Sequence, residues 1–81
     1  MAFFVYILEC GDGSLYTGIT TNLNKRLSEH SMGKGSKYVR SRLPARILHS
    51  EEFETRSEAL KRENQIKRLT RKQKRMLVSG P

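Results

Sequence analysis

The fold is decided by residues 3–20, which read FFVYILECGDGSLYTGIT. The first part, Phe3–Leu8, is aromatic or aliphatic at every position, which is typical of a central strand that is covered on both faces. The segment Gly11–Ser14 is a strong turn signal, and Leu15–Thr20 then returns as a second strand. The stretch therefore predicts a short hairpin with a phenol on each arm.

The two arms carry Tyr6 and Tyr16, and the length of the loop between the strands decides whether their side chains share a face. Because side chains alternate along a strand, a loop of three or five residues places both tyrosines on one face, whereas two or four residues separate them. The sequence alone leaves this choice open.

Downstream of the hairpin, the pattern predicts one helix and one more strand. Residues 20–22 offer N-caps for a helix that runs to about His30. A glycine-containing loop and an ambiguous basic stretch, residues 37–42, follow it. A third strand is expected over Ala45–Ser50 or slightly beyond, and Pro44 places it at a sheet edge or at a strand start.

Two capping signals then predict two further helices. Thr55 begins a helix that should end near Leu69, and Thr70 begins a shorter one that should end near Val78. The resulting order, β-β-α-β-α-α, predicts an α+β fold: a small three-stranded antiparallel sheet flanked by helices.

The size of the chain allows one small domain, which we place at residues 1–78, with residues 79–81 as a flexible C-terminal end. The single cysteine, Cys10, excludes an intramolecular disulfide and a site built from several cysteines, and it fits a reducing, cytoplasmic setting. The apolar run at the start is too short to cross a membrane. No obligate protein partner is evident.

The charge is strongly positive and unevenly distributed. Sixteen Lys and Arg against eight Asp and Glu give a net charge of +8 and a pI near 10.2. Residues 55–81 contain nine Lys and Arg against two Glu. A basic end on a small domain predicts a polyanionic partner, most commonly nucleic acid, although a solvated helix face is the plainer interpretation.

Glu63 is the most informative polar residue. On the predicted helix it lies between positions that form the apolar face, namely Ala59, Leu60 and Ile66. A carboxylate directed at a core is costly unless it is paired or bound to a cation. The alternatives are an outward-facing side chain and a salt bridge to a nearby Lys67 or Arg62.

Arg26 and His30, spaced i, i+4 on one helix, complete a set of five polar groups with Glu63 and the two tyrosines. The set suits hydrolysis of a phosphodiester: Arg26 neutralises the phosphate, and Glu63 provides a hard oxygen ligand for Mg²⁺. Tyr6, Tyr16 or His30 accepts a proton from water. We expect the nearby positive charge to lower the pKa of the phenols.

The segments Val5–Ile7 and Tyr16–Gly18, followed by Arg26, His30 and Glu63, resemble the GIY-YIG nuclease superfamily over about residues 4–69. The likeness is greatest to its small stand-alone bacterial proteins. The motifs here read Val-Tyr-Ile and Tyr-Thr-Gly. The resemblance implies a three-stranded antiparallel sheet flanked by helices, which agrees with the predicted order of elements.

By the same resemblance, Tyr6 and Tyr16 are the motif tyrosines, one a general base and the other positioning phosphate or water. Gly18 is the motif glycine, where a side chain would crowd the site. Arg26 stabilises the pentavalent phosphate, His30 relays protons and Glu63 is the one metal ligand, for Mg²⁺ with Mn²⁺ able to substitute.

The expected activity is metal-dependent endonucleolytic cleavage of DNA in repair or recombination. Because no DNA-recognition domain follows in the chain, we expect recognition of structure or of the phosphate backbone rather than of sequence. RNA is not excluded, and the alternative is a nucleic-acid-binding module without catalysis. The candidate nucleic-acid contacts are Lys34, Lys37, Tyr38, Asn64, Lys67, Arg68, Arg71 and Lys72.

Overall fold

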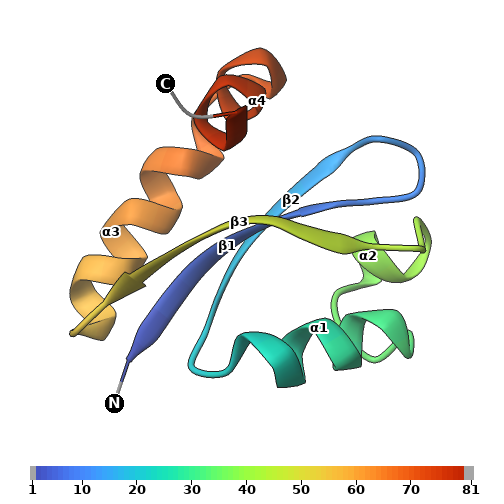
Figure 1. The fold of residues 1–81 in the computed structure, drawn as a ribbon, viewed down its shortest axis with the longest axis horizontal. Coiled ribbons are helices and arrows are strands. Elements are labelled where there is room, and N and C mark those ends of the chain that lie inside the picture. Colours follow the sequence, from blue (N-terminus) through green and yellow to red (C-terminus); the bar gives the residue numbers. More distant parts are fainter. Residues whose placement is uncertain (1, 80–81) are drawn as a thin grey trace.

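The computed structural model describes residues 2–79, which form a three-stranded antiparallel sheet with helices on both faces (Figure 1). This confirms the predicted α+β class. One helix was not predicted. It is a single turn formed by part of the ambiguous basic stretch. The elements are β1 (Phe3–Glu9), β2 (Leu15–Thr20), α1 (Leu23–Ser31), α2 (Lys37–Arg40), β3 (Arg46–Phe53), α3 (Arg56–Lys67) and α4 (Arg71–Ser79).

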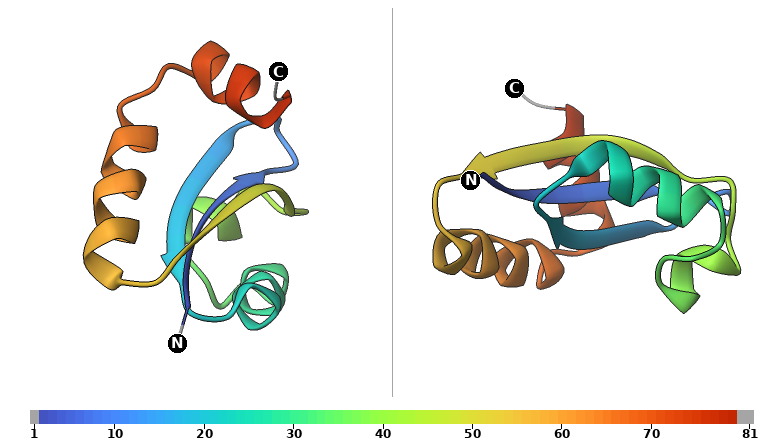
Figure 2. Two further views of the ribbon diagram at one scale, coloured as in Figure 1. Left: turned by 60° about the vertical axis from the view of Figure 1, so that its left-hand side comes forward. Right: turned by 90° about the horizontal axis from the view of Figure 1, so that it is seen from below.

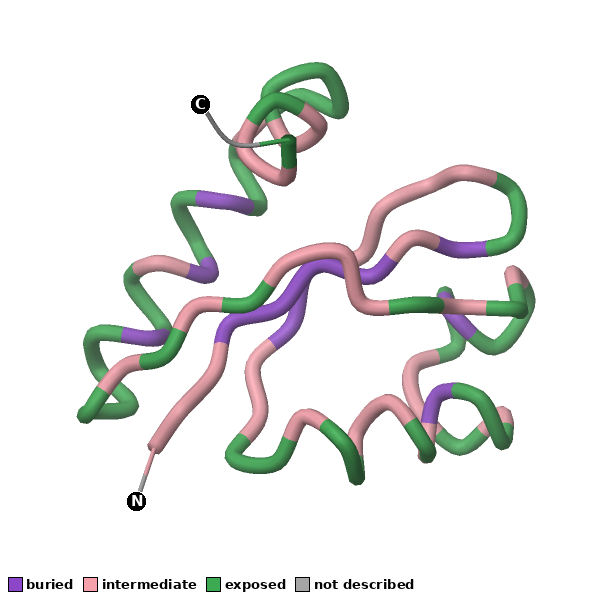
Figure 3. Tube along the Cα trace, viewed as in Figure 1, coloured by how far each residue is buried: buried purple, intermediate pink, exposed green. Residues whose placement is uncertain are grey.

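The central strand is β1, as its apolar sequence predicts. The strand order is β2-β1-β3, and the run Val5–Leu8 is fully buried (Figure 3). Val5 and Ile7 pack with Ala59 and Ile66 of α3 on one face of the sheet. The side chains between them point to the opposite face, so β1 contributes to two separate cores.

The register of the hairpin places both tyrosines on one face. Glu9 pairs with Leu15, so five residues form the loop between the strands. Tyr6 pairs with Gly18, and Tyr16 lies opposite the residue two positions after Tyr6. The phenols of Tyr6 and Tyr16 therefore share the sheet face that carries the second core.

The helices form two layers around the sheet. α3 and α4 cover the face of Ile7, and α1 and α2 cover the face of Tyr6 (Figure 2). The right-hand view of Figure 2 shows α3 and α2 projecting past the sheet on the side of β2, so that this edge strand lies between them. The open edge of β2 is thus flanked by both helical layers.

The helices begin where the capping signals predict. The side chain of Asn22 caps α1, and that of Thr55 caps α3. Thr70 and Gln73 form a reciprocal box at α4, with Thr70 N donating to Gln73 Oε1 at 2.8 Å and Gln73 N donating to Thr70 Oγ1 at 3.1 Å. Local side-chain bonding to the backbone therefore sets these three boundaries.

Several boundaries and one face differ from expectation. β3 continues to Phe53, and α3 stops at Lys67. Ser79, which we expected in a flexible end, is the last residue of α4; residues 80–81 lie outside the described part of the chain. Leu60 is 37% exposed, because α3 turns Ala59, Glu63 and Ile66 toward the sheet and leaves Leu60 at the side of that stripe.

Candidate active site

Tyr6 and His30 form the centre of the candidate site. Each is only 1% exposed, and the hydroxyl of Tyr6 lies 3.2 Å from Nε2 of His30. His30 arrives from the last turn of α1, whose residues Leu23 and Leu27 pack on the same core. Leu23, Leu27 and His30 therefore lie on the face that α1 turns to the sheet.

Tyr16 completes a cluster of three rings. Its ring centroid is 6.4 Å from that of Tyr6 and 5.6 Å from that of His30. Tyr38, from α2, stacks against Tyr16 with centroids 6.0 Å apart, and the guanidinium carbon of Arg42 lies 3.9 Å from the centroid of Tyr38. Tyr38, which we proposed as a nucleic-acid contact, is thus also part of the wall that supports Tyr16.

Two glycines leave room for these rings. Gly18 lies opposite Tyr6, and a Cβ atom added there would overlap the Tyr6 hydroxyl. A Cβ atom at Gly35 would overlap the imidazole of His30. The role of Gly18 follows the family motif. Gly35 was missed, because a glycine-containing loop signals a turn but not what the turn approaches.

Arg26 approaches the cluster from α1, one turn before His30. It lies against both Tyr6 and His30, and the gap between these side chains is too small to hold a water molecule. Its Nε atom is 3.3 Å from Oε1 of Glu29, yet this buried atom has no hydrogen-bond partner among residues 2–79. The guanidinium is therefore held near the phenol while retaining donors that an anion can use.

Burial, followed by the neighbouring Tyr16, raises the pKa of Tyr6 from 10.0 to about 12. The positive charge of Arg26 opposes this shift without cancelling it. Our expectation of a lowered phenol pKa is therefore wrong for Tyr6, because desolvation of the buried ring outweighs the cation beside it.

The imidazole of His30 shifts in the opposite sense. Burial, and then the charge of Arg26, lower the pKa of His30 below its ordinary value of 6.5. The ring is consequently neutral at pH 7, and it is able to accept a proton there.

Glu63 reaches the site from the other layer. It is 8% exposed on α3, as predicted, and its ion-pair partner among residues 2–79 is Lys67, with Nζ 3.4 Å from Oε2. No hydrogen bond joins Glu63 to the ring cluster within these residues. Its negative charge nevertheless contributes to the raised pKa of Tyr6, after burial and Tyr16.

The structure thus brings four of the five predicted groups together on one sheet face and places Glu63 in the opposite layer, on α3. Among residues 2–79 there is no cluster of three or more His, Cys, Asp and Glu side chains able to hold a metal ion. Any divalent ion bound here by Glu63 needs its other ligands from water or substrate.

The candidate nucleic-acid contacts lie in two groups, one in each helical layer (Figure 2). All of them are exposed, so they are accessible to a polyanion. Three already have structural contacts: Tyr38 stacks on Tyr16, Arg71 donates to the carbonyl of Gly13 at 2.9 Å, and Lys67 pairs with Glu63. The group beside α2 is Lys34, Lys37 and Tyr38; that of α3 and α4 is Asn64, Lys67, Arg68, Arg71 and Lys72.

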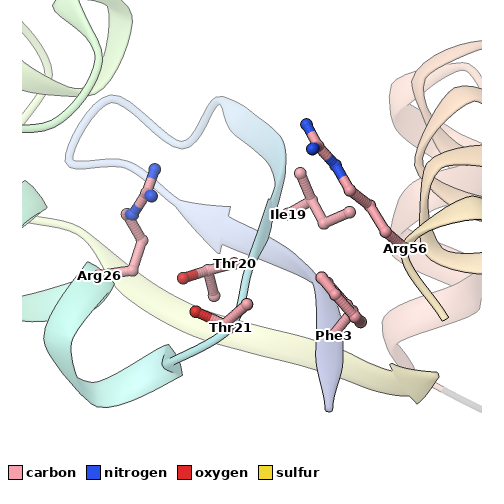
Figure 4. A pocket seen from close by; sticks show the side chains of 6 residues that line it. All are labelled: Phe3, Ile19, Thr20, Thr21, Arg26 and Arg56. Carbon is pink, nitrogen blue, oxygen red and sulfur yellow. The ribbon is translucent and has the colours of Figure 1, made fainter. Parts of the chain in front are cut away.

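A pocket of about 260 Å³ lies beside the cluster, at the end of β2 (Figure 4). Arg26 of α1 and Arg56 of α3 stand on either side of it, and both guanidinium groups point toward the top of the view in Figure 4. Arg56 is not among the residues predicted for the site, because its position next to a capping residue indicates only a helix start. The remaining lining residues are Phe3, Ile19, Thr20 and Thr21.

Among residues 2–79, no helix is both long and apolar enough to cross a membrane.

Comparison with known proteins finds similarity over nearly the whole chain. The family described as the GIY-YIG catalytic domain matches residues 2–76. A UPF0213 protein from Natronomonas pharaonis is 47% identical, with 94% of this chain and 89% of the relative covered. One from Staphylococcus aureus is 49% identical over 93% of this chain and 92% of its own length.

Solved structures show the same likeness. The solution structure of a UPF0213 protein from Bacillus halodurans has 47% sequence identity and a TM-score of 0.64, and the match covers 98% of this chain and 84% of that one. A protein from E. faecalis matches at 50% identity with a TM-score of 0.63, over 91% of this chain and 79% of that chain. The names of these proteins state no activity.

Proposed function

This chain belongs to the GIY-YIG catalytic domain family, and on that premise we propose that it is a metal-dependent endonuclease that hydrolyses DNA phosphodiester bonds. The observation that supports this most is the meeting of Tyr6, Tyr16, Arg26 and His30 on one face of the sheet. We further propose that recognition is directed by structure or backbone rather than by sequence, in repair or recombination.

Arg26 is the proposed phosphate ligand. A guanidinium binds two phosphate oxygens through parallel hydrogen bonds, and it stabilises the charge that accumulates when phosphorus becomes five-coordinate. The absence of a hydrogen-bond partner for its Nε within residues 2–79 supports this role. The ion pair between Nε of Arg26 and Oε1 of Glu29 is long, at 3.3 Å. It holds the side chain and leaves donors of the guanidinium available for hydrogen bonds.

Tyr6 and His30 are the proposed proton relay. The oxygen of water bonds to phosphorus and the ester bond to the leaving oxygen breaks. The proton of the water passes to the hydroxyl oxygen of Tyr6 while the Tyr6 proton passes to Nε2 of His30. A phenol with a pKa of about 12 cannot act as a free phenolate near neutral pH, so it serves as a relay to the neutral imidazole. Tyr16, beside both rings, is the alternative first acceptor.

Glu63 is the proposed ligand of Mg²⁺ or Mn²⁺. Magnesium is commonly held by one or two carboxylates together with waters and substrate phosphates, so a lone, mostly buried glutamate suits it. The ion supplies Lewis-acid stabilisation of a phosphoryl oxygen. Binding at Glu63 has to compete with Lys67, whose ammonium lies 3.4 Å from the carboxylate.

A second candidate function is a nucleic-acid-binding module without catalysis. Two observations favour it: burial and Tyr16 raise the pKa of Tyr6 to about 12, and Lys67 already pairs with Glu63. The basic surface on both sides of β2 would serve such a module equally well.

We expect the purified protein to cleave plasmid, single-stranded or branched DNA with Mg²⁺ or Mn²⁺ and to stop when EDTA is added. Gel analysis of the products measures this directly. Tyr6→Phe, prepared in parallel, should be at least about a hundredfold slower because it lacks the relay oxygen. Equal activity in Tyr6→Phe would exclude the Tyr6 relay and leave Tyr16 as the first acceptor, and equal activity in Tyr16→Phe as well would indicate a contaminating nuclease. DNA binding without cleavage in any metal would favour the second candidate function.

The neutral state of His30 predicts a loss of both activity and stability on the acid side. Because burial and Arg26 lower the folded pKa of His30, the unfolded state binds a proton first as the pH falls. The contribution of His30 to stability is complete above about pH 6.5 and is lost as the pH falls through the folded pKa. The carboxylates with lowered pKa, such as Glu51, titrate below 4.5 and act in a separate window.

We therefore expect the free energy of unfolding, measured in urea between about pH 5 and 7, to decrease toward acid pH in the wild type. This decrease should be smaller in His30→Gln. The other histidine, His49, pairs with Glu51 at 2.8 Å, and His49→Gln should retain the decrease. If the free energy of unfolding of the wild type and of His30→Gln changed with pH in parallel, a lowered pKa of His30 would be contradicted.

A further inference from the structure

The pocket at the end of β2 has the chemistry of a site for a phosphodiester. Its two charged lining residues are arginines, and none of its six lining residues is acidic. The apolar side chains of Phe3 and Ile19 face the same space (Figure 4), and such surfaces suit the sugar carbons between phosphates. The two arginines come from different layers, so a ligand here would bridge α1 and α3.

Arg56 makes no polar contact within residues 2–79 that explains its position. The seven ion pairs among residues 2–79 do not include it, and its side chain donates no hydrogen bond within these residues. It is the first residue of α3, directly after the N-cap Thr55. A cation at this end is unfavourable, because unpaired amide groups make helix N-termini positive. The exposed guanidinium therefore adds positive potential at the pocket.

Arg26 connects the pocket to the reacting groups. It lines this pocket and also packs against Tyr6 and His30. A nucleic-acid strand whose scissile phosphate binds Arg26 would therefore have this pocket beside the same guanidinium.

We infer that this pocket binds the backbone phosphate next to the one that is cut, and that Arg56 is its ligand from α3. The inference rests on the proposed function and assigns a binding residue to the same site. It also sets a direction for the strand, which runs from the ring cluster past Arg26 toward the start of α3. A neutral polymer would gain nothing from two arginines, so the ligand class is a polyanionic nucleic-acid backbone.

The test is DNA binding in EDTA, which does not require cleavage. The probes are a fluorescein-labelled single strand and the same strand in duplex, titrated at several salt concentrations. Arg56→Gln should weaken binding about tenfold and reduce the slope of log K against log salt by about one. The matched control is Lys61→Gln, which removes one charge from an exposed position of the same helix. It should change affinity by less than about twofold.

Kinetics give a second readout. Arg56→Gln should raise KM while kcat stays near the wild-type value, because the residue binds substrate away from the reacting atoms. Replacing single phosphates by methylphosphonate should identify one position beside the cut whose neutralisation weakens binding by the wild type but not by Arg56→Gln.

The outcomes separate the two proposals. Equal behaviour of Arg56→Gln and Lys61→Gln in an active enzyme would overturn the pocket assignment and leave the proposed function intact. A loss of DNA affinity in Arg56→Gln but not in Lys61→Gln, with no cleavage in any metal, would support the phosphate site and overturn the proposed endonuclease activity. A wild-type protein that neither binds nor cuts DNA would overturn both.

Discussion

Glu63→Gln is expected to lower the rate of DNA cleavage about a thousandfold while leaving DNA affinity in EDTA within about twofold. Loss of a metal-mediated stabilisation of several kcal/mol corresponds to a rate change of this order. The amide is nearly isosteric, so packing against α3 and the sheet is retained. The measurements are initial cleavage rates across a Mg²⁺ titration and fluorescence anisotropy for binding.

The stability of the same variant distinguishes function from folding. Glu63 is 8% exposed and its partner Lys67 is half-exposed, so a neutral amide relieves a buried charge and leaves a cation that water can solvate. We expect the melting temperature to stay constant or rise.

Glu54→Gln is the matched control. It removes the same charge from an exposed residue that forms no ion pair among residues 2–79, and it should change neither rate nor stability. Full activity of Glu63→Gln in Mg²⁺ would exclude Glu63 as a metal ligand. A stabilised variant with unaltered activity would show that the buried carboxylate is only a local packing cost.

Much of the scaffold follows from local chemistry that a sequence displays. The uniform apolarity of Phe3–Leu8 predicts its central place in the sheet, and the side chains of Thr55 and Thr70 predict helix starts. The sequence does not determine whether Tyr6 and Tyr16 share a face, because the turn segment GDGS is compatible with several loop lengths. The loop observed between Glu9 and Leu15 has five residues, one of the two lengths that place the phenols on one face.

The electrostatics and close contacts of the site depend on tertiary packing. The sequence predicts a cation near Tyr6 but not that desolvation outweighs it in setting the pKa of Tyr6, since burial depends on how α1 and α2 cover the ring. Gly35 looks like an ordinary loop residue until its contact with His30 is seen. Arg56 likewise requires the fold, because only the packing of α3 brings it to the pocket that Arg26 lines.

Arg26→Ala should lower kcat by about 10²- to 10³-fold, because it removes a preorganised donor pair from the phosphate at which charge accumulates. Arg26→Lys should recover only part of this loss, since an ammonium keeps the charge but not the forked geometry. Little stability should be lost, because an i, i+3 pair such as Arg26–Glu29 contributes only about 0.2–0.5 kcal/mol. The neighbouring exposed Lys25→Ala is the control and should cut normally.

The same substitution has a second, independent consequence at His30. After burial, the charge of Arg26 is the next contribution that lowers the pKa of His30. Replacing Arg26 by Ala should therefore raise that pKa toward 6.5. The imidazole resonances of His30, followed by NMR, should then titrate at higher pH in Arg26→Ala and be unchanged in Lys25→Ala. The acid limb of any residual activity should shift in the same direction. A lower rate without this shift would mean that Arg26 contacts substrate but lies too far from the relay to tune it, whereas an unchanged rate would remove Arg26 from the reaction.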